Sequence, residues 1–273
     1  MPFEEFAGLH VEDQRSVRRI TFHRPAKLNA FGPSELRDLR HVLQETAQDP
    51  RVRAVILTGS GRAFSAGGDV GAMADALEAG TLPIMFHDLV GEQERCVREI
   101  VEMPKPVVAA LPGVAAGGGM SLALACDWRI GSPDAVLYPA FPALGGIPDG
   151  GLTYFLPHYL GLGGAQEVLF SNRRLDCESA RALGLIHEIV PAAELSERAW
   201  ARATELAQGP VHALGEMKRL LQAAFHGSLE TQLALERRAM VQATRGPELP
   251  EGIRAFREKR PPRFASENRP REP

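Results

Sequence analysis

Lys105–Thr153 reads KPVVAALPGVAAGGGMSLALACDWRIGSPDAVLYPAFPALGGIPDGGLT, and this segment indicates what the chain folds into. It begins with an apolar, β-prone run, Val107–Leu111, which Pro112 ends. Three glycines, Gly117–Gly119, follow and lead directly into the small, helix-prone residues 120–125. Backbone N–H groups at a helix start have no intrahelical partner and lie at the positive end of the helix dipole. The segment therefore predicts a strand, a turn and a helix start able to hold an anion or an oxygen that becomes anionic.

A second glycine-rich turn repeats this plan earlier in the chain. Residues 53–69, RAVILTGSGRAFSAGGD, give a β-branched strand, a turn and small residues ending at a helix start. One such turn is also explained by close packing of a helix on a strand. Two such turns can point N–H groups at one oxygen, and each donor of an oxyanion hole typically lowers a barrier by about 2.7–4 kcal/mol. The pair therefore predicts an oxyanion hole.

Three motifs follow one another along the chain: FSAGGD (64–69), PVVAALPGVAAGGGMSLALACD (106–127) and GGIPDGG (145–151). In these motifs and their spacing the chain resembles the crotonase, or enoyl-CoA hydratase/isomerase, family. The similarity extends from HRPAKLNAF, starting at His23, to AFREKRPPRF, ending at Phe264. The resemblance implies an α/β fold with a crotonase-type ββα spiral core and a C-terminal helical region that forms trimers.

The resemblance also assigns tasks to the two parts of the chain. Residues 1–195 would form the spiral core with the acyl-CoA site, and residues 196–273 would form the helices for oligomerisation and site closure. The substrate would be an acyl-CoA thioester, with coenzyme A present only as part of it and with no other cofactor and no metal. A homotrimer, or a hexamer made of two trimers, is the expected assembly.

Periodicity places the other elements. Strands are expected at 17–23, 52–58 and 127–130. Leu36, Leu39, Val42 and Leu43 recur at helical spacing, which predicts a helix over 33–48 with one buried face. Further helices are expected at 81–102, 177–183, 193–208, 211–226 and 229–243.

Composition limits the class of protein. The 31 basic and 34 acidic residues give a net charge of −3 without long blocks of like charge, so nucleic acid is not an expected partner. Cys96, Cys126 and Cys177 are isolated, which predicts neither a disulfide framework nor a zinc site and fits a reducing compartment. Residues 1–14 are acidic where an export signal would be basic. Residues 106–126 are uncharged but only mildly hydrophobic, so we expect a cytoplasmic protein with no membrane partner.

The resemblance places the oxyanion hole at two backbone groups. Matching the two glycine motifs gives the N–H groups of Gly68 and Gly118 as the donors. Ala66 would offer its carbonyl to the adenine of CoA. Asp69, a favoured N-cap residue, would begin the next helix and, together with Val70, border the substrate.

Two further segments are implied to hold CoA. In the family, the backbone and lysine of the RPAKLNAF turn run beside the pyrophosphate and adenine, which implicates Lys27 and Leu28 here. Lys259 in the C-terminal segment would approach a CoA phosphate, either of its own subunit or of a neighbour. On composition alone, residues 254–264 would be a solvated tail.

The reaction depends on two positions where this chain departs from the hydratases. Hydration in the family uses two glutamates, because water must be both held in line and deprotonated. The first position, two residues after the glycine triplet, holds Ser121, and the second, four residues before Gly145, holds Phe141. Neither side chain can act as a base near neutral pH, so an isomerase is favoured over a hydratase.

One carboxylate remains, Asp149 in GGIPDGG. It stands where the family's dienoyl-CoA isomerases keep a working aspartate, and its context resembles the ring-1,2-epoxyphenylacetyl-CoA isomerase type. An aspartate beside proline and glycine is ordinarily a turn residue. As a catalytic base it would remove a proton, and the same carboxyl would return it elsewhere. Phe141 and Leu144 would form a dry wall that makes the carboxylate more basic.

Four other functions stay open. The chain could be a hydratase-like enzyme, or a dehalogenase-like enzyme in which Asp149 is a nucleophile assisted by a histidine that the sequence does not identify. Gly119–Ala123, GMSLA, nearly matches the G-x-S-x-G motif of serine hydrolases. The fourth possibility is a CoA-binding member of the family without catalysis.

Overall fold

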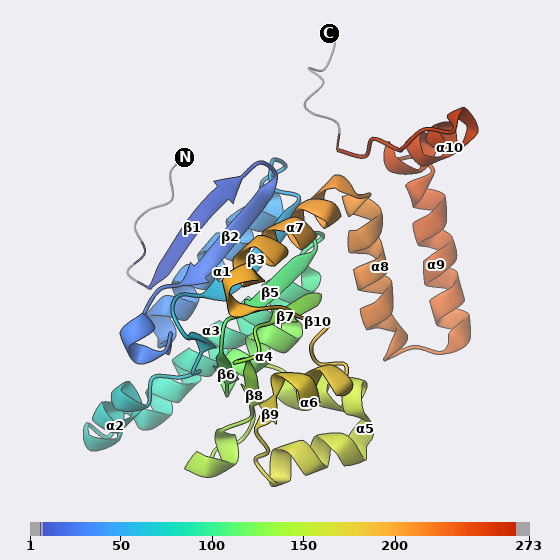
Figure 1. Cartoon of the computed structure of the whole chain (residues 1–273). Helices are drawn as coiled ribbons and strands as arrows, with labels where there is room; N and C mark the ends of the chain where they lie inside the picture. The colour runs from blue at the N-terminus through green and yellow to red at the C-terminus, as the bar shows by residue number, and fades with distance from the viewer. Residues whose placement is uncertain (1–5, 7, 266–273) are drawn as a thin grey trace.

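The computed structural model describes residue 6 and residues 8–265 of the 273-residue chain. Its described strands form two sheets (Figure 1). The larger sheet contains, in spatial order, β1 (Leu9–Gln14), β2 (Val17–Phe22), β3 (Ala54–Gly59), β5 (Val107–Leu111), β7 (Trp128–Gly131) and β10 (Glu188–Ile189). The smaller sheet contains β4 (Ala63–Ser65), β6 (Val114–Ala116), β8 (Val136–Tyr138) and β9 (Leu175–Asp176). Neighbouring strands run parallel except in the pairs β1–β2 and β8–β9.

A strand–strand–helix unit recurs along the chain. β3 is followed by β4, β5 by β6 and β7 by β8, and each time the first strand joins the larger sheet and the second joins the smaller one. The helices α2 (Val70–Glu78), α4 (Gly118–Ala125) and α5 (Leu152–Phe170) follow these pairs. Successive units lie side by side, so the chain winds as a spiral. This confirms the ββα core that the sequence led us to expect.

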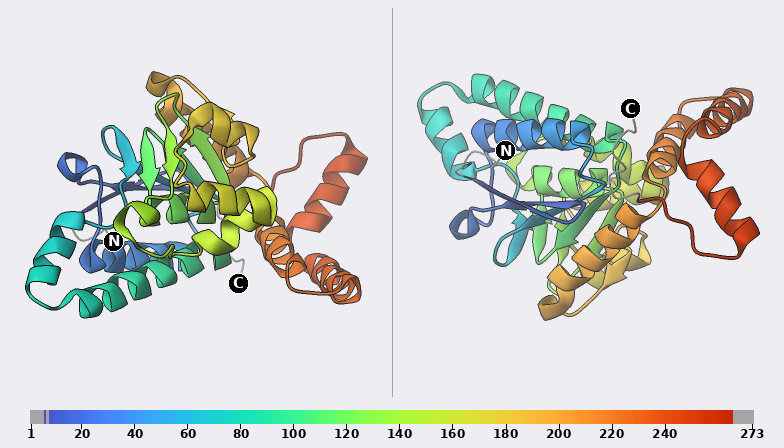
Figure 2. Two further views of the ribbon diagram at one scale, coloured as in Figure 1. Left: turned by 90° about the horizontal axis from the view of Figure 1, so that it is seen from below. Right: turned by 90° about the horizontal axis from the view of Figure 1, so that it is seen from above.

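Helices cover the larger sheet on both faces, as parallel sheets require. The helices α1 (Pro33–Gln48) and α3 (Leu82–Glu102) lie on one face and α7 (Leu195–Gln208) on the other (Figure 2). The predicted apolar face of α1 is confirmed, since all four of its residues, Leu36, Leu39, Val42 and Leu43, are 0% exposed. Fully burying a leucine contributes about 1.5–3 kcal/mol.

The helix α7 belongs to the body of the molecule. Ala199, Ala203 and Ala207 recur every four residues on its buried side and pack with Ile56 and Val108 of the sheet. Small side chains at this spacing let the helix axis approach the strands closely. The proposed division of the chain at residue 195 stays a prediction, and α7 itself packs against the sheet.

The remaining helices, α8 (Val211–Ala224), α9 (Leu229–Ala243) and α10 (Glu248–Glu258), project from the body on the side away from α2 (Figures 1 and 2). We call residues 211–258 the C-terminal arm. Lys218 attaches it to the body by donating to Asp127 Oδ2 at 2.8 Å and to the Ile100 carbonyl at 2.6 Å. Within the arm, Glu248 of α10 accepts hydrogen bonds from two N–H groups at the start of α8. The arm is therefore a connected unit held by polar contacts.

Several elements differ from the expectation, including the short strands β4, β6, β8, β9 and β10, which were not expected. Residues 70–78, expected as a helix start followed by a loop, form the complete helix α2 before α3 begins. The strand β1 was not expected, because its exposed face carries polar residues without a clear alternation. Residues 254–258, expected as a solvated tail, are the end of α10, whose strongly amphipathic pattern lies across the expected boundary. The other described helix, α6, spans Cys177–Ala182, as expected to within one residue.

None of the helices in the described residues is both long enough and apolar enough to cross a bilayer.

Candidate active site

The two glycine turns lie side by side because their strands are neighbours. β4 pairs in parallel with β6 through Ser65 and Ala115, and the turns follow the carboxyl ends of these strands. Gly67 shows how close the turns are: a Cβ placed on it would lie 3.2 Å from the nitrogen of Gly118 and 2.6 Å from the oxygen of Ala116. The φ angle of Gly67 is +86°, which a side chain would also disfavour. The turns at 66–69 and 117–119 therefore meet only because glycine occupies this position.

The N–H groups of Gly68 and Gly118 are both free to bind a ligand. The main chain of Phe31 pairs with the first turn: its N–H donates to the Gly67 carbonyl, and its carbonyl accepts from the Asp69 N–H. The N–H of Gly68, which lies between these two residues, takes no part in this pairing. Gly118 is the first residue of α4 and has no intrahelical acceptor for its N–H. Neither group donates a hydrogen bond within the part of the chain that is described. Unpaired N–H groups on two adjacent turns are the donors that an oxyanion hole would need.

Asp149 stands close to the second turn. Its Oδ1 accepts a hydrogen bond from Gln93 Nε2 at 2.9 Å, and its main-chain oxygen accepts one from Ser121 Oγ at 2.9 Å. Burial raises the pKa of this carboxyl to about 6, although the hydrogen bond from Gln93 acts in the opposite direction. The carboxylate is thus predominantly ionised at neutral pH yet has a pKa near it, as a general base requires.

Gln93 connects Asp149 to Gly118. A Cβ on Gly118 would lie 3.0 Å from Gln93 Cδ, so the side-chain amide packs directly on this residue of the hole. The same amide donates to Asp149. One side chain therefore lies between the proposed donor and the proposed base.

Gln93 was not among the residues predicted from the sequence. A signal was present, because Gln93 interrupts the apolar stripe that Leu89, Cys96 and Ile100 form along α3. A buried amide within such a stripe needs a polar partner. The partner lies 56 residues further along the chain, and the helix pattern alone cannot reveal it.

Phe141 forms one wall of the site. It begins the short 3-10 helix η2 (Phe141–Leu144), and its ring atom Cζ would lie 3.9 Å from a Cβ on Gly117. Leu144, expected to share this wall, is 64% exposed, because η2 turns its far end toward solvent. In the single chain the dry wall therefore depends on Phe141.

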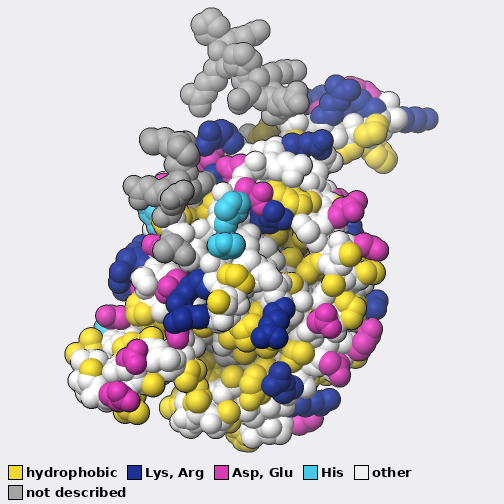
Figure 3. Space-filling model, turned by 60° about the vertical axis from the view of Figure 1, so that its left-hand side comes forward, with side chains coloured by type: hydrophobic (Ala, Val, Ile, Leu, Met, Phe, Trp, Pro, Cys, Tyr) yellow, Lys and Arg dark blue, Asp and Glu magenta, His cyan; other side chains and the backbone are white. Residues whose placement is uncertain are grey.

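Other apolar side chains surround the first turn. A Cβ on Gly68 would overlap the methyl group of Met73 and would lie 3.5 Å from Leu89 Cδ2. Further apolar side chains are exposed near α2, α3 and η2, and Figure 3 shows hydrophobic side chains gathered over the lower part of the face it displays. These exposed residues are Leu77, Ile84, Phe86, Leu144 and Ile147. The surroundings of the site therefore suit an apolar group.

Ser121 is buried in α4, and the structure gives it a supporting contact. Its side chain is 0% exposed, and its hydroxyl donates to the main-chain oxygen of Asp149. A nucleophilic serine needs its hydroxyl accessible and within reach of a base. Within the described residues no histidine is hydrogen-bonded to Ser121. This geometry argues against the serine-hydrolase interpretation.

The turn at 24–28 is bound to the first glycine turn. Lys27 Nζ lies 2.7 Å from Asp69 Oδ2, and this ammonium group lowers the pKa of Asp69. Leu28 has a φ of +50° and accepts a hydrogen bond from Ala66 N–H at 2.9 Å. These contacts bring Lys27, Leu28, Ala66 and Asp69 together at the first glycine turn.

Asp69 also begins α2, since its Oδ1 accepts from Ala72 N–H at 3.3 Å. Val70, the next residue, is 53% exposed. Lys259 lies elsewhere: it directly follows α10 as the C-cap residue, and α10 is at the opposite side of the molecule from α2 (Figure 2). The structure therefore brings together all predicted substrate residues near the first turn but does not bring Lys259 to them.

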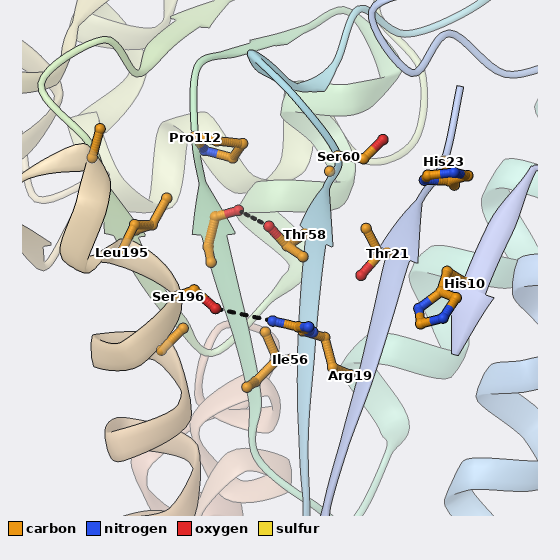
Figure 4. A pocket seen from close by; sticks show the side chains of 14 residues that line it. His10, Arg19, Thr21, His23, Ile56, Thr58, Ser60, Pro112, Leu195 and Ser196 are labelled. Carbon is orange, nitrogen blue, oxygen red and sulfur yellow. Dashed lines mark hydrogen bonds between the residues drawn. The ribbon is translucent and has the colours of Figure 1, made fainter. Parts of the chain in front are cut away.

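A separate hollow of about 430 Å³ lies on the face of the larger sheet that α7 covers (Figure 4). Arg19, Thr21, His10 and His23 line it, and Arg19 donates to Ser196 at 3.0 Å. It shares no lining residue with the two glycine turns. Among the described residues, no group of three His, Cys, Asp or Glu side chains comes close enough to hold a metal ion.

Comparison with known proteins completes the description of the site. The sequence matches the family described as enoyl-CoA hydratase/isomerase over residues 12–267. It is 37% identical to a protein of Rhodobacter capsulatus named "Probable enoyl-CoA hydratase", over 94% of this chain and 97% of that protein. It is 35% identical to the 1,2-epoxyphenylacetyl-CoA isomerase of Escherichia coli, over 95% of this chain and 98% of that protein. The crystal structure of an enoyl-CoA hydratase from Polaromonas sp. JS666 has a TM-score of 0.89 and 30% identity, over 93% of this chain and 98% of that one.

Proposed function

Because this chain belongs to the enoyl-CoA hydratase/isomerase family, we propose that it is an acyl-CoA isomerase in which Asp149 is the single base. The observation that carries the proposal is one carboxyl with a pKa of about 6 that Gln93 connects to Gly118, whose N–H, like that of Gly68 on the adjoining turn, has no partner among the described residues. The two positions where the family's hydratases keep glutamates hold Ser121 and Phe141. One acid and one oxyanion hole are sufficient to move a proton from one carbon to another.

In the proposed reaction the thioester oxygen accepts hydrogen bonds from the N–H groups of Gly68 and Gly118. Asp149 removes a proton from a carbon next to, or conjugated with, the carbonyl, and the electron pair moves to the thioester oxygen. Each donor stabilises the resulting enolate by typically about 2.7–4 kcal/mol. The protonated carboxyl then returns the proton to a different carbon, which shifts the double bond and restores the carboxylate. The reaction needs no group besides the acyl-CoA itself.

The surroundings of Asp149 favour isomerisation over hydration. Hydration needs a water molecule held in line and a group to deprotonate it. The hydroxyl of Ser121 is directed to the main chain of Asp149, and Phe141 offers no polar atom. The apolar side chains of Phe141, Met73 and Leu89 suit an acyl group that is an uncharged alkene or aromatic ring.

Hydration by Asp149 alone is the second candidate, and the name of the relative from Rhodobacter capsulatus favours it. The two reactions differ in whether the product contains a new oxygen atom. Incubation in ¹⁸O-labelled water separates them, because only hydration incorporates the label and raises the product mass by one water.

We also propose how CoA and neighbouring subunits engage the chain. Lys27 and the main chain of Leu28 and Ala66 would hold the nucleotide end of CoA. The C-terminal arm exposes several large apolar residues, Met217, Leu221, Phe225, Leu229, Leu233, Met240, Ile253 and Phe256, which supports burial against other subunits in a trimer or hexamer. Lys259 of the partner subunit would then approach the CoA phosphates.

The test of the reaction is a panel of enoyl-, dienoyl-, aryl- and epoxy-acyl-CoA compounds, with products analysed by mass spectrometry. We expect the protein to isomerise at least one of them, and Asp149→Asn to lose turnover while still binding the CoA thioester. Asp134→Asn, the same change at an exposed loop residue, is the matched control and should leave turnover intact. Full turnover by Asp149→Asn would contradict the proposal.

A further inference from the structure

Gln93 is a buried polar residue on a helix that otherwise presents apolar side chains to the site. Its side chain is 1% exposed, and it lies on α3 between Leu89 and Cys96. Of its charged neighbours, Glu92 is buried and pairs with Arg40 of α1, whereas Glu94 is exposed and pairs with Arg98. A buried amide is costly unless its polar atoms are bonded, so the orientation of Gln93 is determined by what it meets inside.

The amide of Gln93 meets two turns at once. Its Nε2 donates to Asp149 Oδ1 at 2.9 Å. Gly118 and Gly150 both approach it so closely that a Cβ on either residue would lie 3.0 Å from Gln93 Cδ. Because Cβ atoms tolerate no such approach, both positions need glycine while Gln93 is present. The side chain is therefore packed between two turns, next to Asp149.

We propose that Gln93 is a positioning residue that holds Oδ1 of Asp149, so that Oδ2 alone exchanges the proton with the substrate. This inference rests on the proposed isomerase function. A carboxylate has two equivalent oxygens, and a fixed N–H donor makes them different, since the oxygen that accepts the bond is the poorer site for a proton. One atom would then both remove and return the proton. The transfer would proceed on one face of the substrate, and the proton would have little opportunity to exchange with solvent.

The hydrogen bond from Gln93 also affects the pKa of Asp149. Burial raises the pKa of Asp149, and the Gln93 hydrogen bond lowers it by favouring the ionised form. No charged side chain contributes to this balance among the described residues. The two opposing effects therefore predict what happens when the donor is removed.

The first experiment uses the protein without any acyl-CoA. For each protein, the unfolding free energy is measured across a range of pH, with and without the Asp149→Asn substitution. The difference between the two values changes as Asp149 ionises, and the midpoint of that change gives its pKa. In Gln93→Met, which keeps the length of the side chain but has no donor, the midpoint should rise by about one pH unit, the size of a lost charge-assisted hydrogen bond. Cys96→Ala, at another buried position of α3, is the control and should leave the midpoint near 6.

A second variant, Gln93→Glu, keeps the test possible if Gln93→Met does not fold. Gln93→Glu keeps the shape of the side chain and places a second carboxyl beside Asp149. The two carboxyls would titrate as a coupled pair, and the upper apparent pKa should rise further than in Gln93→Met. A midpoint that stays near 6 in whichever of these variants folds overturns the inference.

The second experiment follows the proton. A substrate deuterated at the carbon that loses its proton is converted, and the deuterium retained in the product is measured by mass spectrometry. Retention should fall in Gln93→Met and stay unchanged in Cys96→Ala, because both oxygens of Asp149 become available only when the donor is lost. Equal retention in the three proteins contradicts the single-oxygen transfer.

The outcomes distinguish this inference from the proposed function. If Asp149→Asn abolishes turnover but Gln93→Met changes neither the titration nor the retention, the isomerase proposal stands and the role of Gln93 is wrong. If Asp149→Asn keeps full turnover, the isomerase proposal is wrong and the catalytic role of Gln93 falls with it. The titration alone then decides whether Gln93 holds Oδ1.

Discussion

The hydroxyl of Ser121 donates a hydrogen bond to the main-chain oxygen of Asp149 over 2.9 Å. The same oxygen accepts from the N–H of Leu152 at the start of α5. The position at which the family's hydratases keep their first glutamate is thus occupied here by a residue that supports the turn carrying the remaining acid. Serine at position 121 therefore both removes a carboxylate and adds a hydrogen bond that supports the turn of Asp149.

Removing this hydroxyl should affect both stability and turnover. Ser121→Ala loses one buried hydrogen bond, which costs about 0.5–1.5 kcal/mol of unfolding free energy, and kcat should fall because the turn at Asp149 loosens. Ser132→Ala is a matched control, since Ser132 is also buried and donates to the Pro112 carbonyl at 3.0 Å away from the site. Chemical denaturation and steady-state kinetics check the pair. A similar fall in kcat for both variants would argue against a specific role for Ser121.

The pKa of Asp149 predicts the pH dependence of turnover. A base with a pKa of about 6 is protonated and inactive below that pH, so kcat/KM should rise as pH increases through about 6 and level off above 7. Measuring initial rates from pH 4.5 to 8.5 tests this. A profile that is flat across this range would show that Asp149 is not the group that titrates.

The ionisation of Asp149 should also change the unfolding free energy, which should fall over the pH range in which kcat/KM rises. The native state binds the proton of Asp149 more tightly than the unfolded state, so the unfolding free energy falls as pH rises from about 4 to 6. Asp149→Asn removes this cost and should be more stable than the unaltered protein above pH 6, by at most about 3 kcal/mol, with little difference below pH 4. Thermal unfolding at pH 4 and pH 7.5 provides the comparison. A destabilised Asp149→Asn at pH 7.5 would refute it.

Gly118 should tolerate no side chain. In Gly118→Ala the new methyl would lie 2.9 Å from Phe31 Cζ and would press on Gln93, so the N–H of residue 118 should move out of the oxyanion hole. Losing one donor of such a hole typically costs about 10²–10³-fold in kcat. Gly163→Ala, at a glycine in α5 with open space around its Cβ position, is the control and should keep full activity. Activity of Gly118→Ala within a few-fold of normal would argue that this N–H is not used.

The C-terminal arm should depend on Glu248. Its carboxylate accepts from the N–H groups of His212 and Ala213, both at 3.0 Å, and thereby caps α8. Glu248→Ala should cost about 0.5–2 kcal/mol of local stability and increase hydrogen exchange in residues 211–224. Exchange at β5, in the core, should stay unchanged. Equal protection of α8 in both proteins would contradict the assigned cap.

Much of the fold could be predicted from the sequence because its determinants are local. The buried face of α1 follows from the spacing of four apolar residues, and the meeting of the two glycine turns follows from parallel pairing of the strands before them. The strand β1 was missed because only one of its faces is apolar and its residues do not alternate cleanly. The local residue pattern therefore predicted most of the helices and the main strands, but it did not predict every strand or every boundary.

The site was predictable only in part. Gly68, Gly118 and Asp149 stand in recognisable motifs, and the structure places Gly118 and Asp149 against Gln93 and Gly68 in the adjoining turn. Gln93 itself and the support from Ser121 depend on contacts between segments far apart in the chain, which a single sequence does not display. The exposure of Leu144 depends on the direction in which η2 turns, which its residues do not determine on their own.

The close approach of Gly150 to Gln93 makes the residue allowed at position 150 depend on the residue at position 93. A Cβ on Gly150 would lie 3.0 Å from Gln93 Cδ and 2.8 Å from Ser121 Cβ, so a side chain at position 150 requires a smaller one at position 93. Relatives of this chain that carry a side chain at position 150 should therefore also carry a smaller residue at position 93. Loss of the glutamine alone should not free position 150, because its φ of +56° and its contact with Ser121 still favour glycine.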